Sequence, residues 1–226
     1  MMSTSQQRAV ILSLLAVALL AVPSCGGGGT TSSPAATAPT ARTSASSASS
    51  AASQTYSSKD FVVPLTVTVD TALKSPPTED SSHLLTWDAV APEINKVRFM
   101  VPVVVFRPEN ETPEAPPEEY VKFLMAQSNS GAKFSKVSKI TVDGHPATLM
   151  DATTNQELAG SLGCTERVSS KHDDSCFGLQ PDYYLRLAVT NVDESTLLVW
   201  ARTGIDNPDQ AFQAMFERML TTVQLR

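Results

Sequence analysis

The sequence has few of the residues on which metal chemistry depends. Its 226 residues include only three histidines and three cysteines. The histidines, His83, His145 and His172, are scattered without the spacing of a metal site. His172 is followed by Asp173 and Asp174, but three adjacent residues cannot all reach one ion without a further ligand. We therefore interpret this stretch as a solvated acidic loop and expect no metal.

Phosphate-binding motifs and positive charge are also scarce. The one run of glycines, residues 26–29, is not followed by a helix, which a phosphate-binding loop requires. All 23 acidic residues but only 15 of the 17 basic ones lie in residues 59–226, which gives this part a formal charge of −8. A chain this acidic offers no basic stripe to nucleic acid. We expect neither a cofactor nor a nucleic-acid partner.

No hydrophobic run is long enough for a comfortable membrane span. The longest, residues 9–22, is preceded by a stretch whose only charged side chain is Arg8. This layout is typical of a secretory signal peptide, which we place at residues 1–24.

The end of that segment carries a cysteine in a specific context. Val22, Pro23, Ser24 and Cys25 resemble the lipobox of bacterial lipoproteins, in which the cysteine is acylated and becomes the new N-terminus. The resemblance implies lipid attachment at Cys25 and a protein anchored to the extracytoplasmic face of the cell membrane. The alternative is an ordinary signal peptide cut elsewhere, with Cys25 discarded or free.

Residues 25–58 are rich in Ser, Thr, Ala, Pro and Gly. After Cys25 they contain one charged residue, Arg42, and one aromatic residue, Tyr56. Such a composition cannot bury enough apolar surface to offset its ordering entropy. We predict a disordered tether here, followed by a single globular domain at residues 59–226.

Two cysteines remain once Cys25 is lipidated. Cys164 and Cys176 form an even pair, and in an oxidising compartment we expect them to be disulfide-bonded. The bond would close a polar loop at residues 165–175.

Hydrophobic patterns in the domain predict an antiparallel α+β fold, with helices packed on the sheet. The segment at 96–106 is apolar on both faces, which predicts a strand covered on both sides. Asp143-Gly144 and residues 192–194 are expected hairpin turns. The remaining expected strands lie at 61–69, 83–87, 136–142, 145–152, 183–191 and 195–203.

Two helices are expected. One spans about 118–131, and Gly131 can cap its end. The other begins with Asn207 as the N-cap and Pro208 at the first helical position. It then carries an apolar stripe that we interpret as core: Phe212, Met215, Phe216, Met219 and Leu220.

Two short motifs imitate catalytic signatures. Residues 159–163 resemble a nucleophile elbow around Ser161, but a polar loop follows where a hydrolase needs a helix. Ser130 and Lys133 have S-x-x-K spacing, yet the partner motifs of penicillin-binding proteins are absent from the sequence. We assign no catalytic residue and expect a protein that is not an enzyme.

A first strand led by Phe61, the hairpins, the mid-chain helix and the C-terminal helix together resemble the PsbP-like α/β/α sandwich. With the lipobox and tether, the chain is similar to the Lpq-type lipoproteins of mycobacteria. The resemblance implies an extracytoplasmic accessory or ligand-binding protein without chemistry of its own.

Two functions remain open at this point. One is a binding module for a lipid, glycolipid or other small molecule of the envelope; the other is a protein-interaction scaffold without a pocket. Flexible methionines suit an adaptable pocket, although they can equally be core filler. They are Met100, Met125, Met150, Met215 and Met219.

Overall fold

The computed structural model describes residues 53–226. The predicted signal peptide at 1–24, the lipidation site Cys25 and the tether as far as residue 52 lie outside the described residues. Within 53–226, no helix has the length and apolar character needed to cross a membrane.

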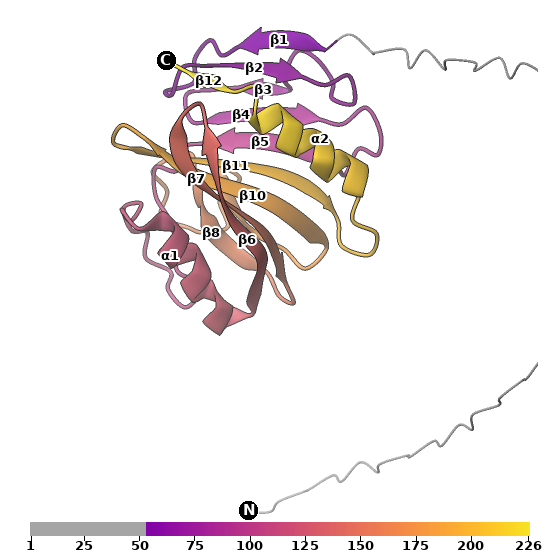
Figure 1. Ribbon diagram of the computed structural model, residues 1–226. Helices are drawn as coiled ribbons and strands as arrows, with labels where there is room; N and C mark the ends of the chain where they lie inside the picture. The colour runs from indigo at the N-terminus through magenta and orange to yellow at the C-terminus, as the bar shows by residue number, and fades with distance from the viewer. Residues whose placement is uncertain (1–52) are drawn as a thin grey trace, which may run out of the picture. The chain divides into compact units, whose positions relative to one another are not determined.

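A seven-stranded antiparallel sheet forms the centre of the domain (Figure 1). In spatial order its strands are β3 (Glu79–Asp80), β4 (Leu84–Asp88), β5 (Lys96–Met100), β11 (Ser195–Gly204), β10 (Tyr183–Val192), β7 (His145–Thr154) and β6 (Ala132–Val142). Both predicted hairpin turns are confirmed. Asp143 and Gly144 have φ values of 47° and 80°, as a two-residue turn with positive φ at both positions requires.

Smaller elements cover the two faces of this sheet. A second sheet contains β1 (Gln54–Ser57), β2 (Leu65–Val69) and β12 (Gln224–Leu225), and a hairpin contains β8 (Leu158–Cys164) and β9 (Cys176–Leu179). The helices are α1 (Tyr120–Ala126), which continues as a 3-10 turn to Ser130, and α2 (Gln210–Leu220). The predicted α+β class, an antiparallel sheet with helices packed on it, is confirmed.

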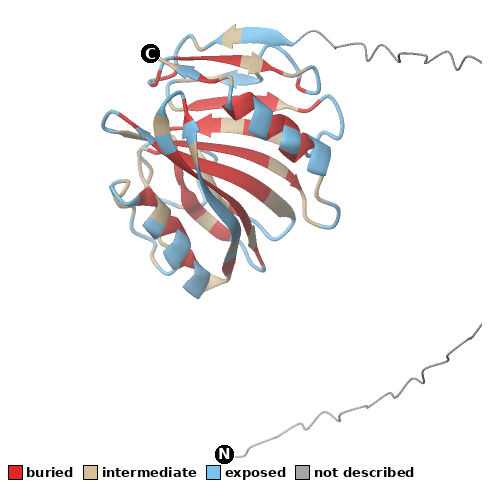
Figure 2. Cartoon of the chain, in the orientation of Figure 1, coloured by how far each residue is buried: buried red, intermediate tan, exposed pale blue. Residues whose placement is uncertain are grey.

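Alternation along the strands divides the interior into two hydrophobic cores. Phe99 of β5 belongs to a core shared with α2 and β2, whereas its neighbour Met100 belongs to a core shared with α1, β8 and β9. The prediction of a strand covered on both faces is therefore confirmed for Lys96–Met100, but the strand predicted over 96–106 ends at Met100. Figure 2 shows both helices buried along the side that meets the sheet and exposed on the other.

The predicted ends of the helices are only partly correct. Gly131 follows the 3-10 turn with φ of 93°, so the predicted cap is confirmed. The N-cap of α2 is Asp209, two residues later than the predicted Asn207. An Asp209 carboxylate oxygen accepts a 2.9 Å hydrogen bond from the backbone N–H of Phe212, which fixes the first turn. The apolar stripe of α2 is buried as expected.

Folded structure begins earlier than the expected boundary at residue 59. Residues 54–57, assigned to the tether by composition, form β1 and pair with β2. Tyr56 packs edge-on against Trp87 with ring centroids 5.4 Å apart, and its hydroxyl donates to Asp80. Burial, followed by this carboxylate, raises the pKa of Tyr56. One aromatic side chain therefore secures a strand whose composition is otherwise that of a linker.

The packing of Tyr56 leads to a stability prediction. Tyr56→Ala removes the aromatic pair and the hydrogen bond, and we expect it to lower the free energy of unfolding by about 1–2 kcal/mol. Urea unfolding followed by tryptophan fluorescence measures this change. Thr55→Ala, at an exposed position of the same strand, is the matched control and should change stability little. Equal stability of the Tyr56 variant and wild type would contradict the anchoring role.

Candidate functional site

The serine of the elbow-like sequence does not occupy an elbow. Ser161 lies within β8, is fully buried, and its hydroxyl accepts a 3.3 Å hydrogen bond from the backbone N–H of Leu179. The flanking glycines have a packing reason instead. Gly160 and Gly163 have φ values of 66° and 105°, and a Cβ on Gly163 would come within 2.6 Å of a Pro102 carbon.

The other chemical candidates are not brought together. Ser130 ends the 3-10 turn and Lys133 lies on β6. His172 and Asp173 lie in the loop between β8 and β9, where Asp173 accepts hydrogen bonds from the backbone and side chain of Ser175. No group of three or more potential metal ligands occurs among residues 53–226.

The predicted disulfide is present. Cys164 at the end of β8 is bonded to Cys176 at the start of β9, and the two residues are register partners in the hairpin. The bond ties this hairpin together at the point where the polar loop 165–175 leaves it. Phe177, next to the bond, packs against the core beneath.

The methionines do not gather around one pocket. Met100 and Met150 are buried in the core beneath α1, and Met215 and Met219 belong to the core beneath α2. Met125 is 38% exposed on α1. Their distribution matches core filling and gives no support to an acyl-chain cavity.

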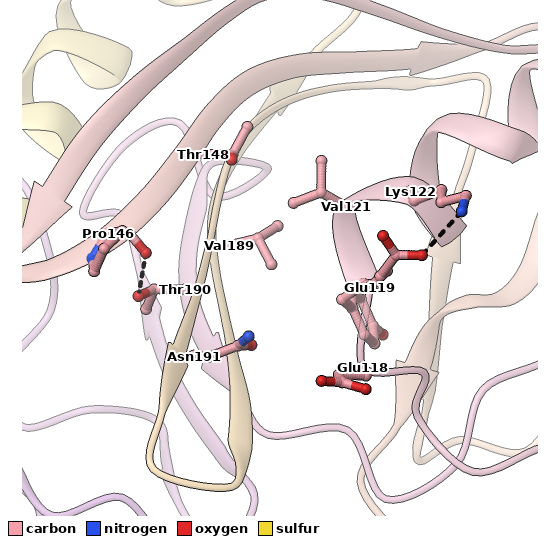
Figure 3. A pocket seen from close by; sticks show the side chains of 10 residues that line it. Glu118, Glu119, Val121, Lys122, Pro146, Thr148, Val189, Thr190 and Asn191 are labelled. Atoms are coloured by element: carbon pink, nitrogen blue, oxygen red, sulfur yellow. Dashed lines mark hydrogen bonds and ion pairs between the residues drawn. The ribbon is translucent and has the colours of Figure 1, made fainter.

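One hollow lies between α1 and the strands β7 and β10 (Figure 3). It has a volume of about 410 Å³, with Val121 and Val189 facing each other across it. Its rim groups already have partners within the protein: Glu119 binds Lys122 at 2.9 Å, and the hydroxyl of Thr190 donates to the carbonyl oxygen of Pro146 at 2.9 Å. None of the residues that line this groove has a buried side-chain polar atom without a hydrogen-bond partner.

A second hollow, of about 190 Å³, lies where β5, β11 and β10 meet the β8–β9 hairpin. Arg98 of β5 and Arg202 of β11 enter it from neighbouring strands, because Arg98 is the register partner of Trp200, two residues from Arg202. We call this hollow the arginine pocket. Its other lining residues include Phe177, Gln180, Tyr183 and Trp200.

Aromatic rings hold both guanidinium groups. The Cζ atom of Arg98 lies 4.9 Å from the ring centroid of Phe177 and 5.9 Å from that of Trp200. The Cζ atom of Arg202 lies 4.2 Å from the ring centroid of Tyr183. Stacking on aromatic faces fixes the position of a guanidinium while leaving its N–H edge free to donate.

The charge of Arg98 is poorly compensated. Neither Arg98 nor Arg202 forms an ion pair with a carboxylate in the described part of the chain. The Nε of Arg98 is buried without a hydrogen-bond partner. Burial, and then the positive charge of Arg202, lower the pKa of Arg98 to about 10. The side chain therefore stays cationic at neutral pH, in surroundings that disfavour its charge.

Sequence reasoning did not find this pocket. Its two arginines are separated by more than a hundred residues, and Phe177 comes from a third segment. The only local signal was an arginine flanked by apolar residues on a predicted strand, with Arg98 between Val97 and Phe99.

No protein-family model and no curated protein matches the chain. Among solved structures, the chain is similar to the solution structure of cyanobacterial PsbP (CyanoP) from Synechocystis sp. PCC 6803. The TM-score is 0.41 and the sequence identity is 10%, over 77% of this chain and 92% of the other.

The disulfide leads to a prediction about the stability of the domain. Replacing Cys164 and Cys176 together by alanine should lower the free energy of unfolding by about 3 kcal/mol, because the unfolded chain gains freedom. Urea unfolding with and without reductant measures the effect. Reductant should lower the free energy of unfolding of the wild type and leave that of the double variant unchanged. Two free thiols in the unreduced wild-type domain would contradict the bond.

Proposed function

We propose that the protein is a lipoprotein of the Lpq type, anchored through Cys25 to the extracytoplasmic face of the cell membrane. It acts there as a non-catalytic binding module for a small molecule of the envelope. The arginine pocket is its binding site, and the chain between Cys25 and β1 is the spacer. Export is supported by the apolar run ending at the lipobox and by a disulfide in the domain.

One observation carries the binding role. Arg98 places a cationic side chain, with a buried Nε lacking any partner, at a hollow that is open to a ligand. Leaving a buried donor unpaired costs about 1–3 kcal/mol. A ligand that accepts hydrogen bonds from the guanidinium group of Arg98 offsets part of the cost of burying its charge, so the pocket is built at the expense of stability, as binding sites commonly are.

The same geometry supports binding without catalysis. Among the described residues that line the arginine pocket, the Tyr183 hydroxyl is the one group that could act as a nucleophile or base. None of the lining residues offers a free metal ligand. Cations and aromatic rings recognise and orient a ligand. A reaction would need a group that accepts or donates a proton at neutral pH.

The binding role is tested by native mass spectrometry of the full chain, produced in its own host and released from membranes with detergent. We expect an additional mass that is lost on denaturation. It should decrease in Arg202→Gln and persist in Arg218→Gln, a control on the exposed side of α2. A wild-type sample without added mass would contradict the binding module. Crosslinking would then test the scaffold alternative.

The anchor is tested separately. Cys25→Ala removes the acylated thiol, and we expect the protein to move from the detergent phase to the aqueous phase in detergent phase partitioning. Diacyl and amide-linked chains hold a protein firmly, since each buried methylene contributes about 0.8 kcal/mol. Unchanged partitioning of the variant would contradict lipidation at Cys25.

A further inference from the structure

We propose that the ligand of the arginine pocket is held by an oxyanion group, a carboxylate or a phosphate, which accepts hydrogen bonds from Arg98 and Arg202 together. This inference rests on the proposed function and adds the chemical class of the ligand. The oxyanion can belong to a free small molecule or to a lipid headgroup, and both sources present the same acceptor chemistry.

The position of the guanidinium groups supports this assignment. The Cζ atom of Arg98 lies over the ring of Phe177, and that of Arg202 lies over the ring of Tyr183. A guanidinium has five N–H donors in a fixed fork, and this fork matches the two oxygens of a carboxylate or phosphate. One donor of Arg202 is already used within the protein, since its Nε donates to the carbonyl oxygen of Ile94 at 3.1 Å.

The two acids that act on the charge of Arg98 have other partners in the protein. Asp88 forms an ion pair with Lys96, and Glu79 accepts a hydrogen bond from Ser81 at 3.3 Å. Both raise the pKa of Arg98, but by less than burial and Arg202 lower it. The protein therefore brings two cations to one hollow, and no carboxylate is among the residues that line it.

Another buried arginine in the same sheet provides an internal comparison. Arg186 of β10 lies on the opposite face, where its Nη1 donates to Asp151 and its Nε to Glu217, each at 2.9 Å. Asp151 is itself almost fully buried. The charge of Arg186 is thus neutralised by two carboxylates of the same protein. Arg98 differs because its missing partner would have to come from outside.

The size of the pocket limits what enters it. A volume of about 190 Å³ is below the range of about 300–1,000 Å³ that is typical of sites enclosing a drug-sized molecule. It accommodates a charged group with a short attachment. Phe177, Tyr183 and Trp200 supply the apolar contacts for the atoms that carry the oxyanion.

The two tryptophans of the chain give a site-specific readout. Trp200 lines the arginine pocket, whereas Trp87 lies in the core on the opposite side of the sheet. We would titrate inorganic phosphate and acetate into the full chain, isotope-labelled and made soluble by Cys25→Ala, at constant ionic strength with chloride as the balancing anion. Trp200→Phe assigns the indole N–H signals.

The expected result is a saturable shift of the Trp200 indole signal with the Trp87 signal unmoved. Arg202→Gln should weaken the affinity at least about tenfold, because hydrogen bonds to charged groups contribute that much or more. Arg218→Gln removes the same charge at a distance and should leave the affinity unchanged. Equal losses in the two variants would show a general charge effect and overturn the assignment.

A second experiment distinguishes the two possible sources of the oxyanion. Vesicles of phosphatidylglycerol and of phosphatidylcholine are sedimented with the same soluble chain and with its Arg202→Gln variant. Phosphatidylglycerol binding that depends on Arg202 identifies a headgroup. Phosphate or acetate binding without vesicle binding identifies a free small molecule.

Failure of this inference is distinguishable from failure of the proposed function. If neither anion shifts the Trp200 signal, yet native mass spectrometry finds a ligand lost in Arg202→Gln, the pocket binds a molecule of another class and the oxyanion assignment is wrong. If no ligand is found and no anion binds, both proposals are wrong. Circular dichroism of each variant confirms that the fold is retained.

Discussion

The architecture depends on one constraint, a central sheet that is apolar on both faces. Val97 and Phe99 belong to one core, and Met100 and Trp200 to the other. Neither face can be left to water, since each buried large apolar side chain contributes about 1.5–3 kcal/mol. A single layer of helices would cover only one of the two faces of the sheet. The chain therefore needs two covers, and it takes them from segments that lie far apart in sequence.

The two covers differ in how they are fixed. Helix α2 presents a continuous apolar stripe and is further held by Glu217, which accepts from Arg186. The other cover combines the short helix α1 with the β8–β9 hairpin. Here the two strands of the hairpin approach each other closely, and there is no broad apolar stripe like that of α2. A Cβ on Gly178 would lie only 2.0 Å from the carbonyl oxygen of Leu158. The disulfide closes this hairpin beside Phe177, and the arginine pocket forms where the cover ends.

The sequence predicted the elements with strong local signals. The Asp143-Gly144 turn and the α2 stripe depend on residues within a few positions of one another, and both are confirmed. Asn207 was chosen as the N-cap because Pro208 follows it, but the carboxylate of Asp209 reaches the N–H of Phe212 and begins the helix there. Strand β1 was missed because Tyr56 gains its packing partner, Trp87, only in the folded chain. The arginine pocket was missed for the same reason, since its walls come from three separate segments.

Charge acts on two length scales in this domain, over its whole surface and inside the arginine pocket. The formal charge of −8 in residues 59–226 is spread over a surface, and salt at physiological strength screens it beyond about 8 Å. Inside the arginine pocket, Arg98 and Arg202 are partly removed from water, where screening is weaker and each contact with an anion is stronger. The acidic surface opposes loose accumulation of anions and approach to an anionic bilayer. If the arginine pocket binds an anion, as we propose, the geometry of its two guanidinium groups selects that anion. This favours a ligand that reaches the site as a free molecule over one still embedded in the bilayer.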